Sequence, residues 1–251
     1  LNSYSLKTSF KRDYIEGVNT SNMEKLTGPR YTIDRTPISC EEFINLNEDS
    51  GYTVGELKKI HTDGLNYMDD LGSYHVIRGY EDGKYIWKTD FVITVGQLVM
   101  YRKNEKNSSI RNGSLGEIVK INEVDSEVIS IVIKFQNIKD PIEIFKTTYE
   151  HPDWNNLKVT AFPIITAFAI TIHKLQGQTI KSPLFIHYSN DLIPYYEEQE
   201  HLLYTAISRC NKMENVYIIS DNEITENHFP VNEHMFNWWR SINEGQPVIV
   251  E

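Results

Sequence analysis

The arrangement of apolar and polar positions changes near Leu157. Beyond it, apolar runs that predict buried strands alternate with segments whose apolar residues recur at helical spacing. The predicted strands are Val159–Ile170 with the turn that follows it, Pro183–Tyr188 and Asn215–Ser220, and the predicted helices are Thr171–Gln178 and Tyr195–Cys210. Strands that alternate with helices are typical of a mainly parallel sheet, so this part is predicted to have an α/β fold.

Before Leu157, short runs of β-branched and aromatic residues predict strands: Tyr85–Trp87, Phe91–Thr94, Leu98–Arg102, Glu117–Asn122, Glu127–Phe135 and Ile142–Thr147. The dipeptide Asn112-Gly113 is a strong turn signal, and Gly116 follows it. Together they indicate a small antiparallel unit, such as a barrel. Residues 1–90 show an irregular pattern with one short helix around Val54–Ile60, and Phe236–Ile242 is expected to form a last short helix.

Composition narrows the class of protein. The chain has 251 residues, of which 40% are hydrophobic, and a formal net charge of −10. An acidic chain is not expected to coat nucleic acid with its whole surface, although phosphate contacts need only a local basic track. Two distant cysteines, no metal-ligand spacing and no signal peptide favour a reduced intracellular protein, cytoplasmic or nuclear, without a membrane partner. The first residue is Leu rather than Met, which favours a fragment or processed piece.

Two segments carry groups suited to phosphate chemistry. In Ala167–Ile180, an apolar run is followed by Thr, His, Gln, Gly and Thr at an expected helix start, where free N–H groups favour phosphate. Gly177 would let the backbone approach a phosphate closely. In Leu203–Cys210, Arg209 ends an apolar helical run. An arginine directed at a γ-phosphate stabilises the charge of the transition state.

The two segments resemble motifs V and VI of superfamily 1 helicases, in the branch of RecD, the phage Dda helicase and the PIF helicases. The family patterns are Thr-x-His-Lys-x-Gln-Gly-x-Thr and Tyr-(Val/Thr)-Ala-x-(Ser/Thr)-Arg. The stretch from Gly96 to Val119 is similar to the Gly-x-x-Val-Met…Asn…Asn-Gly-x-x-Gly-x-Val pattern upstream of motif V. This resemblance implies a RecA-like second motor domain with an inserted SH3-like antiparallel unit. It also implies that residues 1–90 begin the motor domain, 91–156 are the β-rich insertion and 157–251 carry motifs V and VI.

The resemblance assigns a role to each matching residue. Arg209 becomes the arginine finger, and Gln176, Gly177 and Thr179 line the nucleotide side of a cleft. Thr171, His173 and Lys174 contact single-stranded nucleic acid, expected to be DNA. Leu6–Arg12 is similar to motif IV, which makes Lys11 and Arg12 nucleotide-binding candidates, although Lys11 stands where the family has arginine. Charge alone suggests a basic track, with a solvated loop as the alternative, at Arg102, Lys103, Lys106 and Arg111.

The chain also departs from the family pattern. It contains neither Gly-x-x-x-x-Gly-Lys-(Ser/Thr) nor a Walker B Asp-Glu, the elements that hold the phosphates of ATP and Mg²⁺. ATP and Mg²⁺ are therefore expected to bind mostly to an N-terminal motor domain of the same protein, and this chain alone is not expected to hydrolyse ATP. The family moves 5′ to 3′ on DNA and unwinds duplexes. The alternative is an inactive nucleic-acid-binding or protein-docking module derived from a helicase.

Two other features are interpreted as lying outside the functional site. Tyr67-Met68-Asp69-Asp70 copies the metal-binding signature of reverse transcriptases, but the polar residues before it do not suit the β-hairpin that this signature occupies. It is predicted to be a solvated turn, and no metal site is predicted. The side chains of His187, His201 and the Glu197-Glu198 pair are expected at the surface or on a cleft wall.

Overall fold

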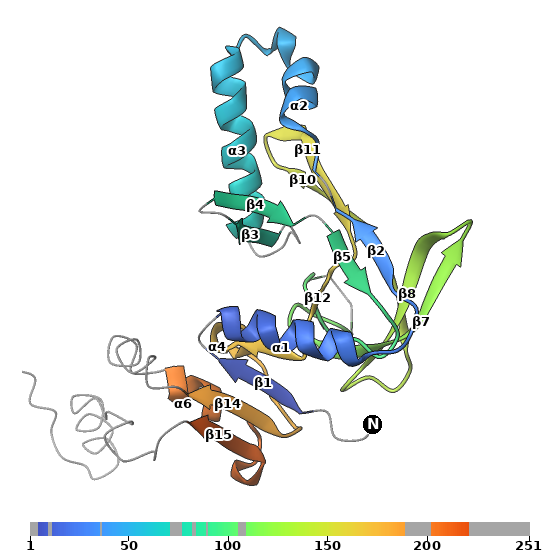
Figure 1. The fold of residues 1–251 in the computed structure, drawn as a ribbon, viewed down its shortest axis with the longest axis vertical. Coiled ribbons are helices and arrows are strands. Elements are labelled where there is room, and N and C mark those ends of the chain that lie inside the picture. Colours follow the sequence, from blue (N-terminus) through green and yellow to red (C-terminus); the bar gives the residue numbers. More distant parts are fainter. Residues whose placement is uncertain are drawn as a thin grey trace, which may run out of the picture. The chain divides into compact units, whose positions relative to one another are not determined.

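The computed structural model describes residues 5–9, 12–35, 37–70, 77–81, 84–88, 90–104, 109–188 and 202–220 (Figure 1). The chain divides into two compact units. One is Leu1–Thr20 with Phe168–Glu251, called here the parallel-sheet unit, and the other is Ser21–Ala167, called the inserted unit. The domains predicted from the sequence are the continuous segments 1–90, 91–156 and 157–251. Their boundaries differ from those of the two compact units, and the domain assignment remains a prediction.

The parallel-sheet unit contains four strands in the order β13-β1-β14-β15, and every neighbouring pair is parallel. This confirms the mainly parallel sheet. The strands are β1 (Leu6–Ser9), β13 (Ala169–Thr171), β14 (Leu184–Tyr188) and β15 (Val216–Ser220). The helical elements are α1 (Arg12–Lys25), α4 (Ile172–Leu175), α6 (Leu202–Ile207) and the 3-10 turn η3 (Met213–Asn215). A central strand, β1, thus comes from the first ten residues of the chain.

The main sheet of the inserted unit is antiparallel, as predicted, with the order β12-β6-β7-β8-β9. Its strands are β12 (Ile164–Thr166), β6 (Leu98–Tyr101), β7 (Leu115–Val124), β8 (Glu127–Phe135) and β9 (Ile142–Phe145). The predicted turn lies between β6 and β7, where Gly113 has φ +96° and donates its N–H to the Tyr101 carbonyl at 2.7 Å. The side chain of Asn104 closes the same loop by accepting the Asn112 N–H at 3.0 Å.

A second group of elements in the inserted unit packs around aromatic and aliphatic side chains. α2 (Cys40–Leu46) and α3 (Val54–Asp70) lie against the hairpin of β10 (Thr147–His151) and β11 (Trp154–Ala161) (Figure 1). Phe43, Leu57 and Leu157 are buried between them. The remaining elements are η1 (Glu48–Ser50) and two antiparallel pairs, β2 (Tyr31–Asp34) with β5 (Asp90–Ile93) and β3 (Ile77–Glu81) with β4 (Lys84–Lys88).

Several expectations need correction. Residues 1–90 are not irregular, because they contain α1, α2 and α3. α1 was missed because its sequence is polar on most sides, so no apolar stripe marks it. The run Val159–Ile170 is not one strand: it forms the end of β11, then β12 and β13, and Pro163, which has no N–H for a sheet, stands between the first two. The helix predicted around Val54–Ile60 continues to Asp70.

The reverse-transcriptase-like tetrapeptide forms the end of helix α3. The prediction of a turn was therefore wrong. The reverse-transcriptase signature requires a β-hairpin, so a helix at this position also does not match it. The proposed helix at Phe236–Ile242, the segment 195–201 and the residues Glu197, Glu198 and His201 lie outside the described residues. Within the described part of the chain, no helix is long and apolar enough to span a membrane.

Candidate functional site

The first motif segment begins at the carboxyl end of strand β13 in the parallel sheet. Strand β13 ends at Thr171, α4 follows at once, and the loop Gln176–Thr179 leads to an isolated parallel bridge between Ile180 and Cys210. The carboxyl ends of parallel strands are where open α/β sheets bind ligands. Thr171, at the end of a strand, and the polar residues of α4 that follow it, His173 and Lys174, therefore lie where ligand binding is expected.

Two backbone hydrogen bonds join the two motif segments. The Ile180 N–H donates to the Arg209 carbonyl at 2.8 Å, and the Asn211 N–H donates to the Ile180 carbonyl at 3.0 Å. Ile180 is buried, which protects this junction from water. Arg209 is part of this junction, and Thr179 is the residue before Ile180. The structure thus brings Thr179 and Arg209 together, although 30 positions separate them in the chain.

Helix α6 precedes Arg209 and is anchored by its buried residues. Leu202, Leu203 and Ala206 are buried, and the helix ends at Ile207. The half-buried Arg209 donates from Nε and Nη2 to the Ser208 hydroxyl at 3.3 and 3.0 Å. A hydroxyl accepts these hydrogen bonds without compensating the positive charge, and a guanidinium has five N–H donors. An anionic phosphate oxygen is therefore a compatible further partner.

The loop Gln176–Thr179 differs from its prediction. The helix expected over Thr171–Gln178 is the single turn α4, and Gln176, Gly177 and Thr179 come after its end rather than at its start. Gly177 ends the turn with φ +78°, in the left-handed region that favours glycine. No heavy atom lies within 4 Å of the position that a Cβ would take there. The exposed backbone is accessible to a ligand, but binding of phosphate at the start of a helix is not supported.

Thr171 belongs to a row of polar side chains across three strands. Its neighbour in register is the buried Ser9 at the end of β1. The Ser9 hydroxyl lies 3.5 Å from His187 Nδ1, and the His187 ring stacks on Tyr14 of α1 at a centroid distance of 3.8 Å. Burial raises the pKa of Tyr14. His187 is therefore half-buried with identifiable partners, where the sequence suggested only a surface or cleft-wall residue.

The predicted basic track lies in the inserted unit as far as it is described. Arg102 follows β6 and is half-buried; burial lowers the pKa of Arg102, and nearby Tyr149 opposes this shift. Lys103 is partly exposed and Arg111 is exposed, with the Arg111 N–H donating to the Ser114 hydroxyl at 3.0 Å. Lys106 and Lys11 lie outside the described residues, and Arg12 begins α1. His173 and Lys174 are exposed on α4, in the parallel-sheet unit.

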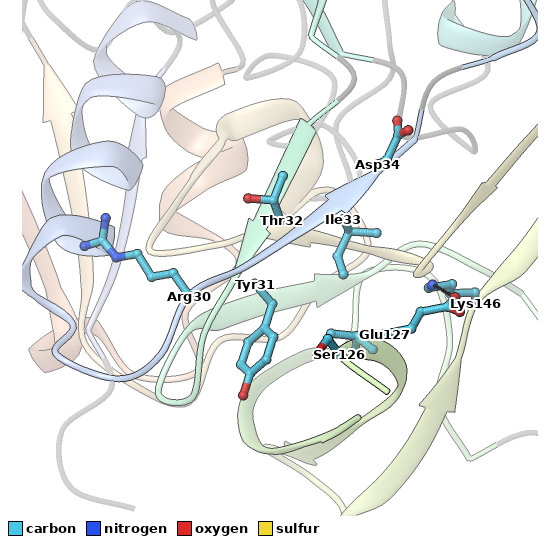
Figure 2. A pocket seen from close by; sticks show the side chains of 9 residues that line it. Arg30, Tyr31, Thr32, Ile33, Asp34, Ser126, Glu127 and Lys146 are labelled. Atoms are coloured by element: carbon cyan, nitrogen blue, oxygen red, sulfur yellow. Dashed lines mark hydrogen bonds and ion pairs between the residues drawn. The ribbon is translucent and has the colours of Figure 1, made fainter. Parts of the chain in front are cut away.

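The inserted unit also contains an open cavity of about 550 Å³ that no sequence signal indicated. Figure 2 shows Arg30 at one end and Glu127 and Lys146, which form an ion pair at 2.9 Å, at the other. Arg30 already donates to the Met23 carbonyl of α1 at 3.1 Å. With Asp34 also in the lining, two cations face two carboxylates around the cavity, so it shows no preference for an anion. Among the described residues, no three His, Cys, Asp or Glu side chains are grouped to hold a metal ion.

One buried cation has a structural role. Arg35, only 1% exposed, lies with its guanidinium carbon 4.6 Å above the ring of Phe91, which attaches the chain beyond β2 to strand β5. Burial lowers the pKa of Arg35 to about 10, against the effect of Asp90. The guanidinium therefore stays protonated at neutral pH.

No protein-family model matches the chain. In sequence it is 27% identical over 215 residues to the ATP-dependent DNA helicase Pif1 of Campylobacter jejuni, covering 82% of this chain and 41% of that protein. In fold it is similar to Pif1 helicase from Candida albicans (TM-score 0.60, 15% identity, 95% of this chain and 50% of that one). It is also similar to Bacteroides Pif1 in complex with ADP-AlF3 and ssDNA (TM-score 0.55, 19% identity, 96% and 46%).

These likenesses confirm the resemblance to the C-terminal half of Pif1-like superfamily 1 helicases. The mixed α/β fold is the one that these helicases share over this half. The chain spans about half the length of the relatives that it matches.

Proposed function

We propose that the chain is the second motor domain of an ATP-dependent helicase that moves 5′ to 3′ along single-stranded DNA and unwinds duplexes. The observation that carries this proposal is the hydrogen-bonded junction of Ile180 with Arg209, which precedes strands β14 and β15 of the parallel sheet. It unites the two segments that resemble motifs V and VI. On this proposal the parallel-sheet unit is RecA-like, and the antiparallel sheet of the inserted unit is the SH3-like insertion.

On the nucleotide side, the residues present suit a triphosphate in part. The Arg209 guanidinium supplies positive charge, and the open backbone at Gly177 permits close approach. The exposed side chains of Gln176 and Thr179 supply hydrogen-bonding groups beside them. Bound ATP would supply free energy through transfer of its γ-phosphate to water. Arg209 would stabilise the charge that develops on that phosphate, and Lys11 and Arg12 are further nucleotide-binding candidates through their likeness to motif IV.

The remaining nucleotide contacts are proposed to come from a partner motor domain with a phosphate loop. This chain contains no Gly-Lys-(Ser/Thr) loop, and the Campylobacter jejuni relative, about twice as long, is described as an ATP-dependent DNA helicase. The partner domain would therefore hold Mg²⁺ and most of the phosphates. Bacteroides Pif1, similar in fold, was crystallised with ADP-AlF3, which supports a nucleotide next to this half.

On the nucleic-acid side, Thr171, His173 and Lys174 are proposed to hold the backbone of the strand. Thr171 ends β13 and is the residue before α4, and its side chain does not cap that helix. His173 and Lys174 are exposed on the same turn, three and two residues before the nucleotide loop begins at Gln176. A shift of α4 would therefore move strand contacts and nucleotide contacts together. Arg102, Lys103, Lys106 and Arg111 would add phosphate contacts from the inserted unit.

Strand-stimulated ATP hydrolysis tests the proposal. The chain joined to its phosphate-loop partner domain is compared with its Arg209→Ala variant. Removing an arginine finger is expected to slow hydrolysis by a factor on the order of 10³ while ATP still binds. Lys212→Ala is the matched control. Lys212 lies three residues after Arg209 and forms an exposed ion pair with Glu214, so the substitution also removes one positive charge. If Arg209→Ala hydrolyses ATP as fast as Lys212→Ala, the arginine has no such role and an inactive binding module becomes the better account.

A further inference from the structure

The side chain of Asn19 forms two hydrogen bonds with the backbone of a single residue far away in the sequence. Its Nδ2 donates to the Ala169 carbonyl at 3.1 Å, and the Ala169 N–H donates to its Oδ1 at 2.8 Å. The primary amide thereby presents one donor and one acceptor, as a neighbouring strand would. Ala169 is only 1% exposed, so both of its backbone groups need partners inside the protein.

The position of β13 in the sheet explains why a side chain has to supply these bonds. β13 is an edge strand whose one neighbour among the described strands is β1. The Lys7 N–H of β1 donates to the carbonyl of Phe168, the residue before Ala169. Successive residues of a strand direct their backbone groups to opposite sides. Ala169 therefore faces away from β1, and Asn19 pairs with it along the open edge.

The bond also lies where the chain leaves and re-enters the parallel-sheet unit. Asn19 is one residue before the end of the first segment at Thr20, and Ala169 is one residue after the start of the second at Phe168. β13 has only three residues, so the ladder with β1 gives it few restraints. The same helix is attached to the sheet a second time by the stacking of Tyr14 on His187. α1 is therefore held to the sheet at two points, Tyr14 and Asn19, and through Asn19 it restrains the edge strand β13.

Thr171 is the last residue of this restrained strand. It lies two residues beyond Ala169 and directly before α4. We infer that Asn19 is a positioning residue for Thr171: by fixing β13 at Ala169 it sets where Thr171 and the α4 turn meet the nucleic-acid backbone. This inference rests on the proposed contact of Thr171 with single-stranded DNA.

Binding of fluorescein-labelled oligo(dT) to the full 251-residue chain, followed by anisotropy, tests the inference. Asn19→Ala removes both bonds to Ala169. Misplaced contacts are costly, so we expect the affinity to fall about tenfold or more. Asn47→Ala is the control, because Asn47 Nδ2 also bonds a backbone carbonyl, that of Phe43 at 2.7 Å, but in the inserted unit. Both variants should lower the unfolding midpoint by a few degrees, whereas Asn47→Ala should bind DNA like the unchanged chain.

Two further variants separate positioning from folding and from the proposed function. Asn19→Asp keeps the acceptor for the Ala169 N–H and loses the donor, so it remains informative if Asn19→Ala does not fold. Thr171→Val removes the contact itself, and the double variant with Asn19→Ala should bind no more weakly than Thr171→Val alone. If Thr171→Val weakens binding and both Asn19 variants do not, the positioning role is refuted and the proposed function stands. If Thr171→Val binds as tightly as the unchanged chain, or that chain does not bind, the proposed contact fails and the inference fails with it.

Discussion

Replacing Gly177 with alanine tests whether the left-handed loop after α4 takes part in nucleotide turnover. Gly177 has φ +78°, and a Cβ added there would meet no heavy atom within 4 Å. The substitution therefore adds backbone strain without a steric clash. An L-residue in the left-handed region costs about 1–2 kcal/mol. The reduced entropy of the unfolded chain offsets about 0.4–1 kcal/mol of this. The free energy of unfolding should then fall by about 1 kcal/mol.

The chain provides a matched control at Gly51. This glycine has φ +81° and the same open surroundings, but it follows η1 in the inserted unit. Urea unfolding of Gly177→Ala and Gly51→Ala should give similar losses of stability. In the motor completed by its phosphate-loop domain, strand-stimulated ATP hydrolysis should slow only in Gly177→Ala. Gly177→Asn should recover part of the lost stability, because asparagine tolerates left-handed backbone better than alanine.

Two results would count against this reasoning. If Gly177→Ala were as stable as the unchanged chain or more so, the strain argument would be wrong. If the two alanine variants lost equal stability and hydrolysed ATP equally fast, the loop would be a structural turn without a role at the nucleotide.

Three further predictions concern the inserted unit. The pKa of Glu56 is lowered by hydrogen bonds from the backbone N–H and hydroxyl of Thr53, at 2.8 and 2.7 Å. The stabilisation by the Glu56 carboxylate should be complete above the ordinary glutamate pKa of about 4.3 and be lost as the pH falls through the lowered pKa of the folded protein. A stability difference between the unchanged chain and Glu56→Gln that persisted at pH 2 would contradict the capping role. Gly116→Ala should lower the free energy of unfolding by about 1–3 kcal/mol in a urea titration, because its Cβ would lie 2.6 Å from Ile133 Cγ2; an unchanged midpoint would show that the strands separate freely there. Phe43→Ala, at a fully buried position, should cost about 3–5 kcal/mol in the same titration, and a loss below 1 kcal/mol would mean that the helices and the β10–β11 hairpin do not share a core.

Local patterns in the sequence predicted the elements whose character is local. β8 was found at Glu127–Phe135, and β14 and β15 followed from short apolar runs between polar segments. The junction of Ile180 with Arg209 was not predicted, because a bond to a residue 29 positions later leaves no trace in local periodicity.

Long-range pairing accounts for what the sequence did not reveal. β1 is a central strand of the parallel sheet, yet its four residues are too few to stand out, and the Thr8 hydroxyl bonds the Ile170 carbonyl 162 positions away. The loop after α4 was placed at a helix start because the left-handed turn at Gly177 was not foreseen. The partners of Asn19 and His187 could not be predicted, because these contacts join α1 to strands far away in the sequence.

Unwinding of tailed duplexes is the decisive experiment on the proposed helicase motor. The complete motor, with ATP and Mg²⁺, is given a DNA duplex with a single-stranded 5′ tail or with a 3′ tail, and strand release is followed by fluorescence. Release is expected only from the 5′-tailed duplex, only with ATP, and it should be lost in Arg209→Ala but not in Lys212→Ala. Absence of ATP-dependent release from either duplex, or equal release with Arg209→Ala, would contradict the assignment of this chain as half of a helicase motor.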